Sequence, residues 1–219
     1  MITPAIFLSP ASFFLSLYDN LRPFYDICSK DNHFTPVLRK LYGYHQIKFA
    51  TPFENACWII LSQRTSLACA REMKEDLIRE FGSSIIVHGT EFRAFPEPPL
   101  LSPAQENDIA RLLENRQKAK QLVSVARAFE EVDEEFLRHG SYETVKNWLQ
   151  NLEGLDTWGA AFVLLRGLGR MEEEPILDKR LIDAASKFYG SDSGSGISLI
   201  AEPYGRWQGY WSHYLRVAA

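Results

Sequence analysis

Residues 151–178 read NLEGLDTWGAAFVLLRGLGRMEEEPILD, and this stretch decides the fold. One helical pattern ends at Gly154, and Asp156 then stands where the N-cap of a second helix is expected. The second helix is apolar on almost every side, which predicts a place in the core. Glycines within 166–170 end it, and an acidic loop leads to Asp178 at the head of a third helix. The stretch therefore predicts a helical hairpin, followed by a loop that delivers a carboxylate.

The helices on either side of this hairpin each carry one apolar face. Before the hairpin, the residues at helical spacing are Tyr142, Val145, Trp148, Leu149 and Leu152. After Asp178, the residues expected to share a face are Leu181, Ile182, Ala185 and Phe188, with Gly190 at the end of the helix. Both patterns predict helices that pack on a core.

The sequence TPFE at 51–54 is a capping box with proline at the first helical position, so a helix is expected to begin there. Its predicted buried stripe is Phe53, Ala56, Cys57, Ile60 and Leu61. Polar residues at 62–66 interrupt it, and a second helix is expected from Leu67 to Phe81, capped by Gly82.

Four further helices are predicted from caps and apolar patterns. They are a packing helix that begins at Ser9-Pro10 and reaches about Ile27, a helix opened by the capping box 102–105 and running to about Glu114, a helix with Arg116, Lys118, Lys120 and Arg127 on its polar positions, and an aromatic helix at 204–214.

The composition excludes several classes of protein. The three cysteines, Cys28, Cys57 and Cys69, have no paired spacing, which indicates a reducing compartment and leaves no cysteine cluster for an iron–sulfur centre. No histidine pairing suits a catalytic transition metal, and no apolar run has membrane length. We expect a cytoplasmic monomer. The net charge of −4 argues against a nucleic-acid partner, but one basic face on an acidic protein suffices for phosphate binding.

Three segments together resemble the helix-hairpin-helix (HhH-GPD) DNA glycosylases, most closely the branch that removes alkylated bases such as 3-methyladenine. They are TPFENACWIILSQRTSLACA at 51–70, LEGLDTWGAAFVLLRGLGR at 152–170 followed by Asp178, and YGRWQGYWSHYL at 204–215. The resemblance implies an all-α fold of two lobes around a cleft. One lobe would run from about 52 to 150 with the hairpin, and the other would combine about 1–51 with about 175–219.

The resemblance implies a monofunctional DNA glycosylase of base excision repair, which flips an alkylated base out of double-stranded DNA and hydrolyses its N-glycosidic bond. Asp178 would then be the catalytic carboxylate, stabilising positive charge on the sugar and orienting the attacking water. The alternative is that Asp178 is only a helix N-cap.

Trp158 and Phe162 lie four residues apart on one helix face. By resemblance they would form the wall of the base pocket, stacking on a cationic purine. Otherwise they are two core aromatics. Branches that also cut the DNA strand carry a lysine where this chain has Trp158, so no Schiff base and no AP-lyase activity are expected.

The remaining site residues also follow from the resemblance. Gln63 and Arg64 would fill the gap that the flipped nucleotide leaves, although Arg64 could equally be a solvated turn residue. The other expected DNA contacts are Gly154, Asp156, Thr157 and Lys179. Relatives bind a monovalent cation through hairpin carbonyls, which would here be those of Gln150, Leu152 and Leu155. No cofactor is required beyond such a structural Na⁺ or K⁺.

Two departures keep other interpretations open. Asp156 replaces the usual second hairpin glycine: aspartate tolerates unusual backbone conformations, but its charge would repel a phosphate. Arg216 takes the place of a pocket tryptophan. The chain could therefore be a non-catalytic DNA-binding module, or a helical protein–protein scaffold. The basic run 116–120 is either a DNA contact or a solvated face.

Overall fold

The computed structural model describes residues 10–101, 105–172, 177–190 and 196–219. The regular elements in these ranges are helices and one β-hairpin, which confirms the predicted all-α class with that single exception. The chain forms two compact units. The first comprises the described parts of 1–50 and 169–219, and the second comprises 51–168.

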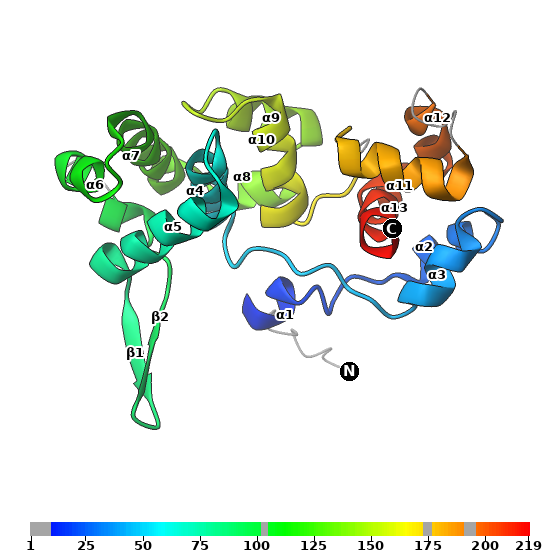
Figure 1. The fold of residues 1–219 in the computed structure, drawn as a ribbon, viewed down its shortest axis with the longest axis horizontal. Coiled ribbons are helices and arrows are strands. Elements are labelled where there is room, and N and C mark those ends of the chain that lie inside the picture. The colour runs from blue at the N-terminus through cyan, green and yellow to red at the C-terminus, as the bar shows by residue number, and fades with distance from the viewer. Residues whose placement is uncertain (1–9, 102–104, 173–176, 191–195) are drawn as a thin grey trace. The chain divides into compact units, whose positions relative to one another are not determined.

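The unit formed by 51–168 holds the predicted hairpin. Its elements are α4 (Pro52–Ser62), α5 (Leu67–Phe81), β1 (Ser84–Val87), β2 (Thr90–Arg93), η1 (Pro98–Leu101), α6 (Glu106–Leu112), α7 (Arg116–Glu131), α8 (Glu134–His139), α9 (Tyr142–Gln150), α10 (Thr157–Phe162) and the π-helix η3 (Val163–Gly167) (Figure 1).

Helix α4 lies at the centre of this unit, in contact with α5, α7, α10 and η3. The predicted stripe is confirmed, because all five of its side chains are buried. Thr51 caps the helix by accepting the Glu54 N–H at 3.0 Å. The Glu54 carboxylate pairs with Lys74 at 2.5 Å. Helix α5 begins and ends where the sequence predicts.

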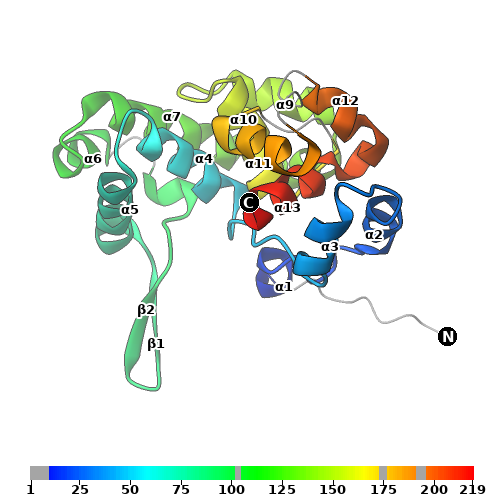
Figure 2. The same cartoon turned by 45° about the vertical axis from the view of Figure 1, so that its right-hand side comes forward.

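The β-hairpin was not predicted. Strands β1 and β2 pair antiparallel with Ser84 opposite Arg93, and both are exposed on both faces. Positive φ angles at His88 (50°) and Gly89 (79°) close the turn, as in tight hairpins. The hairpin projects away from the helices of its unit (Figure 2). Because neither strand buries a face, the sequence lacks the apolar alternation that marks a half-buried strand.

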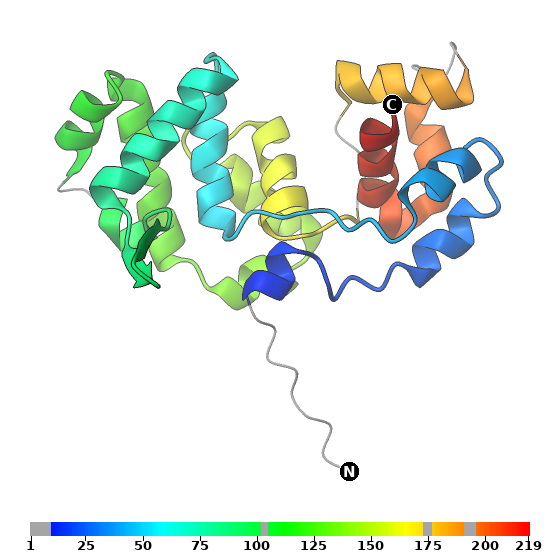
Figure 3. The same cartoon turned by 60° about the horizontal axis from the view of Figure 1, so that its bottom comes forward.

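The other unit joins segments from the two ends of the chain (Figure 3). Its elements are α1 (Pro10–Phe14), α2 (Arg22–Cys28), α3 (Thr35–Leu41), α11 (Lys179–Tyr189), α12 (Ile197–Ala201), η5 (Glu202–Trp207) and α13 (Gln208–Ala218). Helix α13 contacts α3, α11 and η5. None of the helices in the described ranges has the length and apolar content that a membrane crossing requires.

Three sequence predictions for helices need correction or fall outside the described residues. The single packing helix to Ile27 is wrong, because the chain leaves α1 after Phe14 and Ser16 adopts a φ of 56° while its buried hydroxyl donates to the Gln46 carbonyl. Ile182 is 38% exposed, and Ala184 is buried in its place. Ser9, most of the 102–105 capping box and most of the acidic loop before Asp178 lie outside the described residues.

Aromatic side chains form the core of this unit, as the C-terminal pattern indicated. Tyr204, Tyr210, Trp211 and Tyr214 are buried. The predicted helix at 204–214 is broken at Gly205, whose φ is 49° and ψ is −125°. Phe24 contacts three of these rings at centroid distances of 5.1–6.2 Å.

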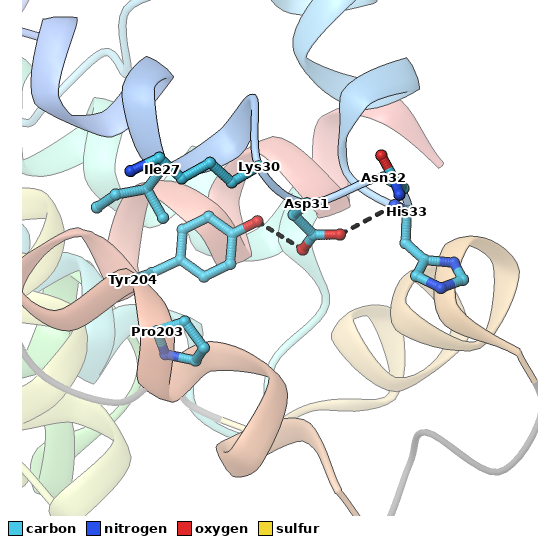
Figure 4. A pocket seen from close by; sticks show the side chains of 7 residues that line it. All are labelled: Ile27, Lys30, Asp31, Asn32, His33, Pro203 and Tyr204. Atoms are coloured by element: carbon cyan, nitrogen blue, oxygen red, sulfur yellow. Dashed lines mark hydrogen bonds between the residues drawn. The ribbon is translucent and has the colours of Figure 1, made fainter.

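Asp31 is the polar centre of the same core. One carboxylate oxygen accepts the hydroxyls of Tyr189 at 2.7 Å and Tyr204 at 2.8 Å. The other accepts the backbone N–H groups of His33 and Phe34 (Figure 4). The pocket beside it, of about 530 Å³, holds none of the predicted site residues. Since four donors already satisfy this carboxylate, we interpret the cluster as structural.

Candidate functional site

The turn between α9 and α10 is the predicted hairpin. Gly154 has a φ of 97°, which favours glycine, and a side chain there would also meet Gln121. Asp156 caps α10, because its carboxylate accepts the Gly159 N–H at 2.7 Å, as predicted. Its φ is −89°, so the backbone at Asp156 is ordinary and extended. The tolerance of aspartate for unusual backbone conformations is therefore not called upon at this position.

Trp158 and Phe162 form a stacked pair on α10, with ring centroids 5.1 Å apart and an interplanar angle of 21°. Trp158 is 42% exposed, so it is no core residue, although Gly159 and Ala160 beside it are buried. The Arg166 guanidinium lies 6.0 Å from the Phe162 ring. Trp158 therefore presents an aromatic ring to solvent on this face of the helix, while Phe162 is partly buried against the core.

The turn between α4 and α5 lies against this hairpin. The Gln63 side-chain amide donates to the Gly154 carbonyl at 2.8 Å. Arg64 is exposed and has a φ of 52°, a conformation that is costly for a residue with a side chain. A cavity of about 870 Å³ opens here, lined by Gln63, Arg64, Thr65, Asn115, Gln117, Lys118, Gln121, Gly154 and Asp156, among others. The structure thus brings together four of the predicted DNA contacts, Gln63, Arg64, Gly154 and Asp156.

Lys118 departs from its predicted place on a polar face. Its side chain is buried, with 7% of the residue exposed. Its ammonium donates to the carbonyls of Ile60 at 2.6 Å, Leu61 at 2.7 Å and Gln63 at 2.9 Å. Burial lowers the pKa of Lys118. The run 116–120 is therefore no continuous basic patch. Of its basic residues only Arg116 and Lys120 face solvent, and Lys120 pairs with Glu153 at 2.9 Å.

Asp178 caps α11, as predicted. One carboxylate oxygen accepts the Leu181 N–H at 2.8 Å, and the other lies 3.2 Å from the Arg216 guanidinium. The side chain of Asp178 remains 37% exposed. Lys179, the first residue of α11, is also exposed. The contact of Arg216 with this carboxylate was not predicted, because a contact between residues so far apart in the chain depends on tertiary packing.

The carbonyls of Gln150, Leu152 and Leu155 are the predicted ligands of a monovalent cation. The Leu152 carbonyl accepts the Leu155 N–H at 3.0 Å, which leaves it one further lone pair. The Gln150 carbonyl ends α9, where partial negative charge gathers. Backbone oxygens are donors that hard cations favour, so the residues suit such an ion. Among the described residues, no cluster of His, Cys, Asp and Glu suits a metal.

Comparisons with known proteins agree with this geometry. The model of the HhH-GPD superfamily of base excision DNA repair proteins matches residues 57–201. A DNA-3-methyladenine glycosylase of Bacillus subtilis is 28% identical over 204 residues, which cover 91% of this chain and 67% of that protein. Two solved structures share the fold. A 3-methyladenine DNA-glycosylase from Archaeoglobus fulgidus has a TM-score of 0.79 and 23% identity, covering 95% of this chain and 72% of that one. An 8-oxoguanine glycosylase/lyase of Clostridium acetobutylicum, solved with double-stranded DNA, has a TM-score of 0.76 and 20% identity, covering 98% and 75%.

Proposed function

The chain belongs to the HhH-GPD superfamily of base excision DNA repair proteins, and from this we propose that it is a monofunctional DNA glycosylase that removes alkylated bases of the 3-methyladenine type. The observation that carries the proposal is the stack of the exposed Trp158 on the half-buried Phe162, on the capped helix after the hairpin. An electron-rich aromatic face attracts a cationic ring, and alkylation makes a purine cationic. The Bacillus subtilis relative, a DNA-3-methyladenine glycosylase, supports the same substrate class.

Asp178 is the proposed catalytic residue. As a base leaves, positive charge builds on the sugar, and a carboxylate beside the sugar stabilises that charge. The cap bond to Leu181 and the contact with Arg216 orient the carboxylate, while its 37% exposure leaves room for a water molecule. The same carboxylate would orient that water for attack on the sugar.

Double-stranded DNA is the proposed partner. Gln63 and Arg64 stand on a turn that can enter the base stack, and the hairpin offers N–H groups near Gly154 and Thr157 for a phosphate. Asp156 uses its carboxylate as a helix cap, which reduces the repulsion of a phosphate that its charge would otherwise cause. Lys179 adds a cation at the head of α11. A monovalent cation on the carbonyls of Gln150, Leu152 and Leu155 would add positive charge to the hairpin.

Strand cleavage is not expected, because Trp158 offers no amine that could form a Schiff base with the sugar. Duplex DNA with one methylated purine is incubated with the protein, and free base and abasic sites are measured. Released methylated base without strand breaks, and without a borohydride-trapped adduct, supports the proposal. A trapped adduct would refute the monofunctional part. DNA binding with no base release would favour a non-catalytic binding module, which the pairing of Asp178 with Arg216 makes a specific alternative.

The Trp158→Ala variant is expected to bind and process a methylated site about tenfold to a hundredfold less well. The physical reason is the loss of one stacking surface, worth about 1–3 kcal/mol for a base on an aromatic ring. Because Trp158 is 42% exposed, its removal should cost little stability. Single-turnover base release at several enzyme concentrations measures the effect. Trp158→Phe keeps a ring and should recover most of the activity, and Tyr42→Ala, at a site 73% exposed, is the control. Equal rates for Trp158→Ala and wild type would exclude this residue from the base pocket.

A further inference from the structure

We propose that Lys118 is a positioning residue that holds the α4–α5 turn in the shape that enters DNA. The inference rests on the proposed function, since it concerns how Gln63 and Arg64 meet a duplex. Lys118 lies on α7, and nothing in its sequence context separates it from its exposed neighbours Arg116 and Lys120.

The Lys118 ammonium uses its full hydrogen-bonding capacity. All three of its N–H donors find an acceptor, on Ile60, Leu61 and Gln63. These carbonyls end α4, where no further helical N–H is available to them and partial negative charge gathers. Lys118 therefore joins the end of α4 to α7 at the residue where the chain turns out of the helix.

Gln63 is bonded both to Lys118 of α7 and to Gly154 of the hairpin. Its carbonyl accepts from Lys118 at 2.9 Å and from the Thr65 hydroxyl at 2.9 Å. Its side-chain amide donates to the Gly154 carbonyl of the hairpin at 2.8 Å. The turn is thereby tied both to α7 and to the hairpin. Two elements that would contact DNA are fixed relative to one another within one unit.

The backbone of Arg64, which directly follows Gln63, is strained. A φ of 52° is unfavourable for arginine and persists only where the surroundings hold it. Lys118 supplies one such hold, because with the Thr65 hydroxyl it fixes the carbonyl that precedes the Arg64 amide. Without these bonds, the turn would relax, and the Arg64 side chain would point in many directions.

Placing the Lys118 ammonium in this buried position costs free energy. Burying an ammonium is unfavourable unless its partners are good. Among the described residues, the acceptors that the Lys118 ammonium contacts are neutral carbonyls. An apolar side chain would fill the same space more cheaply. What the ammonium adds is a fixed direction for three carbonyls, and that direction sets the turn.

The test separates insertion into DNA from chemistry. The probe is a duplex that contains a tetrahydrofuran abasic analogue, with 2-aminopurine as the neighbouring base, so that fluorescence reports entry of the turn into the gap. Lys118→Met keeps the length of the side chain and removes the donors. Lys120→Met, two positions away and exposed, is the matched control. Melting curves establish the folded fraction of each variant.

Lys118→Met is expected to lose the fluorescence change and to slow base release at saturating enzyme about tenfold to a hundredfold, the cost of a misplaced positioning group. Its affinity for undamaged duplex should stay within about twofold, because phosphate contacts remain. Lys118→Arg, which keeps the donors, should recover most of the insertion signal. If Lys118→Met does not fold, Lys118→Gln, which keeps two N–H donors, is compared with Lys118→Arg in the same assay.

Normal insertion and normal saturated rates in the folded fraction of Lys118→Met would overturn the inference, because Lys118 would then be only a structural cap. Wild type that fails to insert at all would overturn it as well. Wild type that inserts normally but releases no methylated base would instead overturn the proposed glycosylase activity, and the comparison of insertion between variants would still decide the role of Lys118.

Discussion

The Asp178→Asn variant is expected to release a methylated base about 10²–10³-fold more slowly than wild type, the range seen when one preorganised electrostatic group is removed from a catalytic site. The substitution is nearly isosteric and removes the charge. Asparagine is as good an N-cap as aspartate, so α11 should keep its first turn and the bond to the Leu181 N–H. Single-turnover base release at saturating enzyme measures the loss.

Asp133→Asn is the matched control for this substitution. Asp133 caps α8 by accepting the Glu135 N–H at 3.0 Å, and it belongs to none of the candidate sites. The same change of charge at this cap should leave the rate within about twofold, as for surface substitutions of this kind. If Asp178→Asn were as active as wild type with equal stability, Asp178 would be a helix cap and nothing more.

The Arg216 contact sets how large this effect becomes. A guanidinium 3.2 Å from the carboxylate keeps it oriented and also offsets part of the negative charge that the sugar would meet. A large loss in Asp178→Asn would show that the remaining charge suffices for catalysis. The departure at Arg216 would then alter the shape of the pocket without abolishing the chemistry.

Raising the pH above about 10 is expected to reduce the free energy of unfolding by at most about 5.6 kcal/mol per pH unit, at about 1.4 kcal/mol for each of four tyrosines. Burial raises the pKa of Tyr189, Tyr204, Tyr210 and Tyr214, in each case as the largest cause. Their ordinary pKa is near 10. Between that value and the raised pKa of the folded state, the unfolded chain has lost protons that the folded chain retains. The contribution of these tyrosines to stability is therefore full below pH 10 and is lost as the pH rises.

Two cysteines add to the same trend from a lower pH. Burial raises the pKa of the Cys28 and Cys57 thiols from an ordinary value near 9. The sign is the same as for the tyrosines, because the neutral form is again the one that the fold retains. The decline should therefore begin near pH 9 and steepen near pH 10.

Urea denaturation at pH 8, 9, 10 and 11 measures the slope. Tyr204→Phe should reduce it by about 1.4 kcal/mol per pH unit, since one ionisable phenol is removed from the buried set. Loss of the hydrogen bond to Asp31 lowers stability at every pH and leaves the slope to report the ionisation alone. Tyr42→Phe, at a site 73% exposed, is the control. A constant free energy of unfolding from pH 9 to 11 would contradict the prediction.

The sequence predicted best those features that depend on a few neighbouring residues. Thr51, Asp156 and Asp178 each accept a backbone N–H three residues later, and this cap chemistry is local. The hairpin turn at Gly154 follows from the backbone freedom of glycine. The bounds of α5, Leu67–Phe81, were predicted for the same reason, whereas α8 at Glu134–His139 was not predicted.

Features that depend on distant contacts could not be predicted. Lys118 looks like its exposed neighbours in the sequence, and only the end of α4, about sixty residues earlier, shows why it is buried. Ser16 breaks the first apolar run because its hydroxyl meets the Gln46 carbonyl. The contact between Arg216 and Asp178 joins two helices that no local pattern relates. The role of each predicted site residue toward DNA stays a prediction.

The β1–β2 hairpin has a practical consequence for work on this protein. Ile85, Ile86 and Phe92 are 65%, 75% and 54% exposed, so the strands share no side chains with the core that sustains the unit. A fluorophore attached at the His88–Gly89 turn between β1 and β2 would lie away from the α4–α5 turn and the α9–α10 hairpin. It would therefore label the protein and leave both of these turns free (Figure 2). Because this hairpin exposes apolar side chains, it is the first segment to shorten or to substitute with charged residues if the protein aggregates at high concentration.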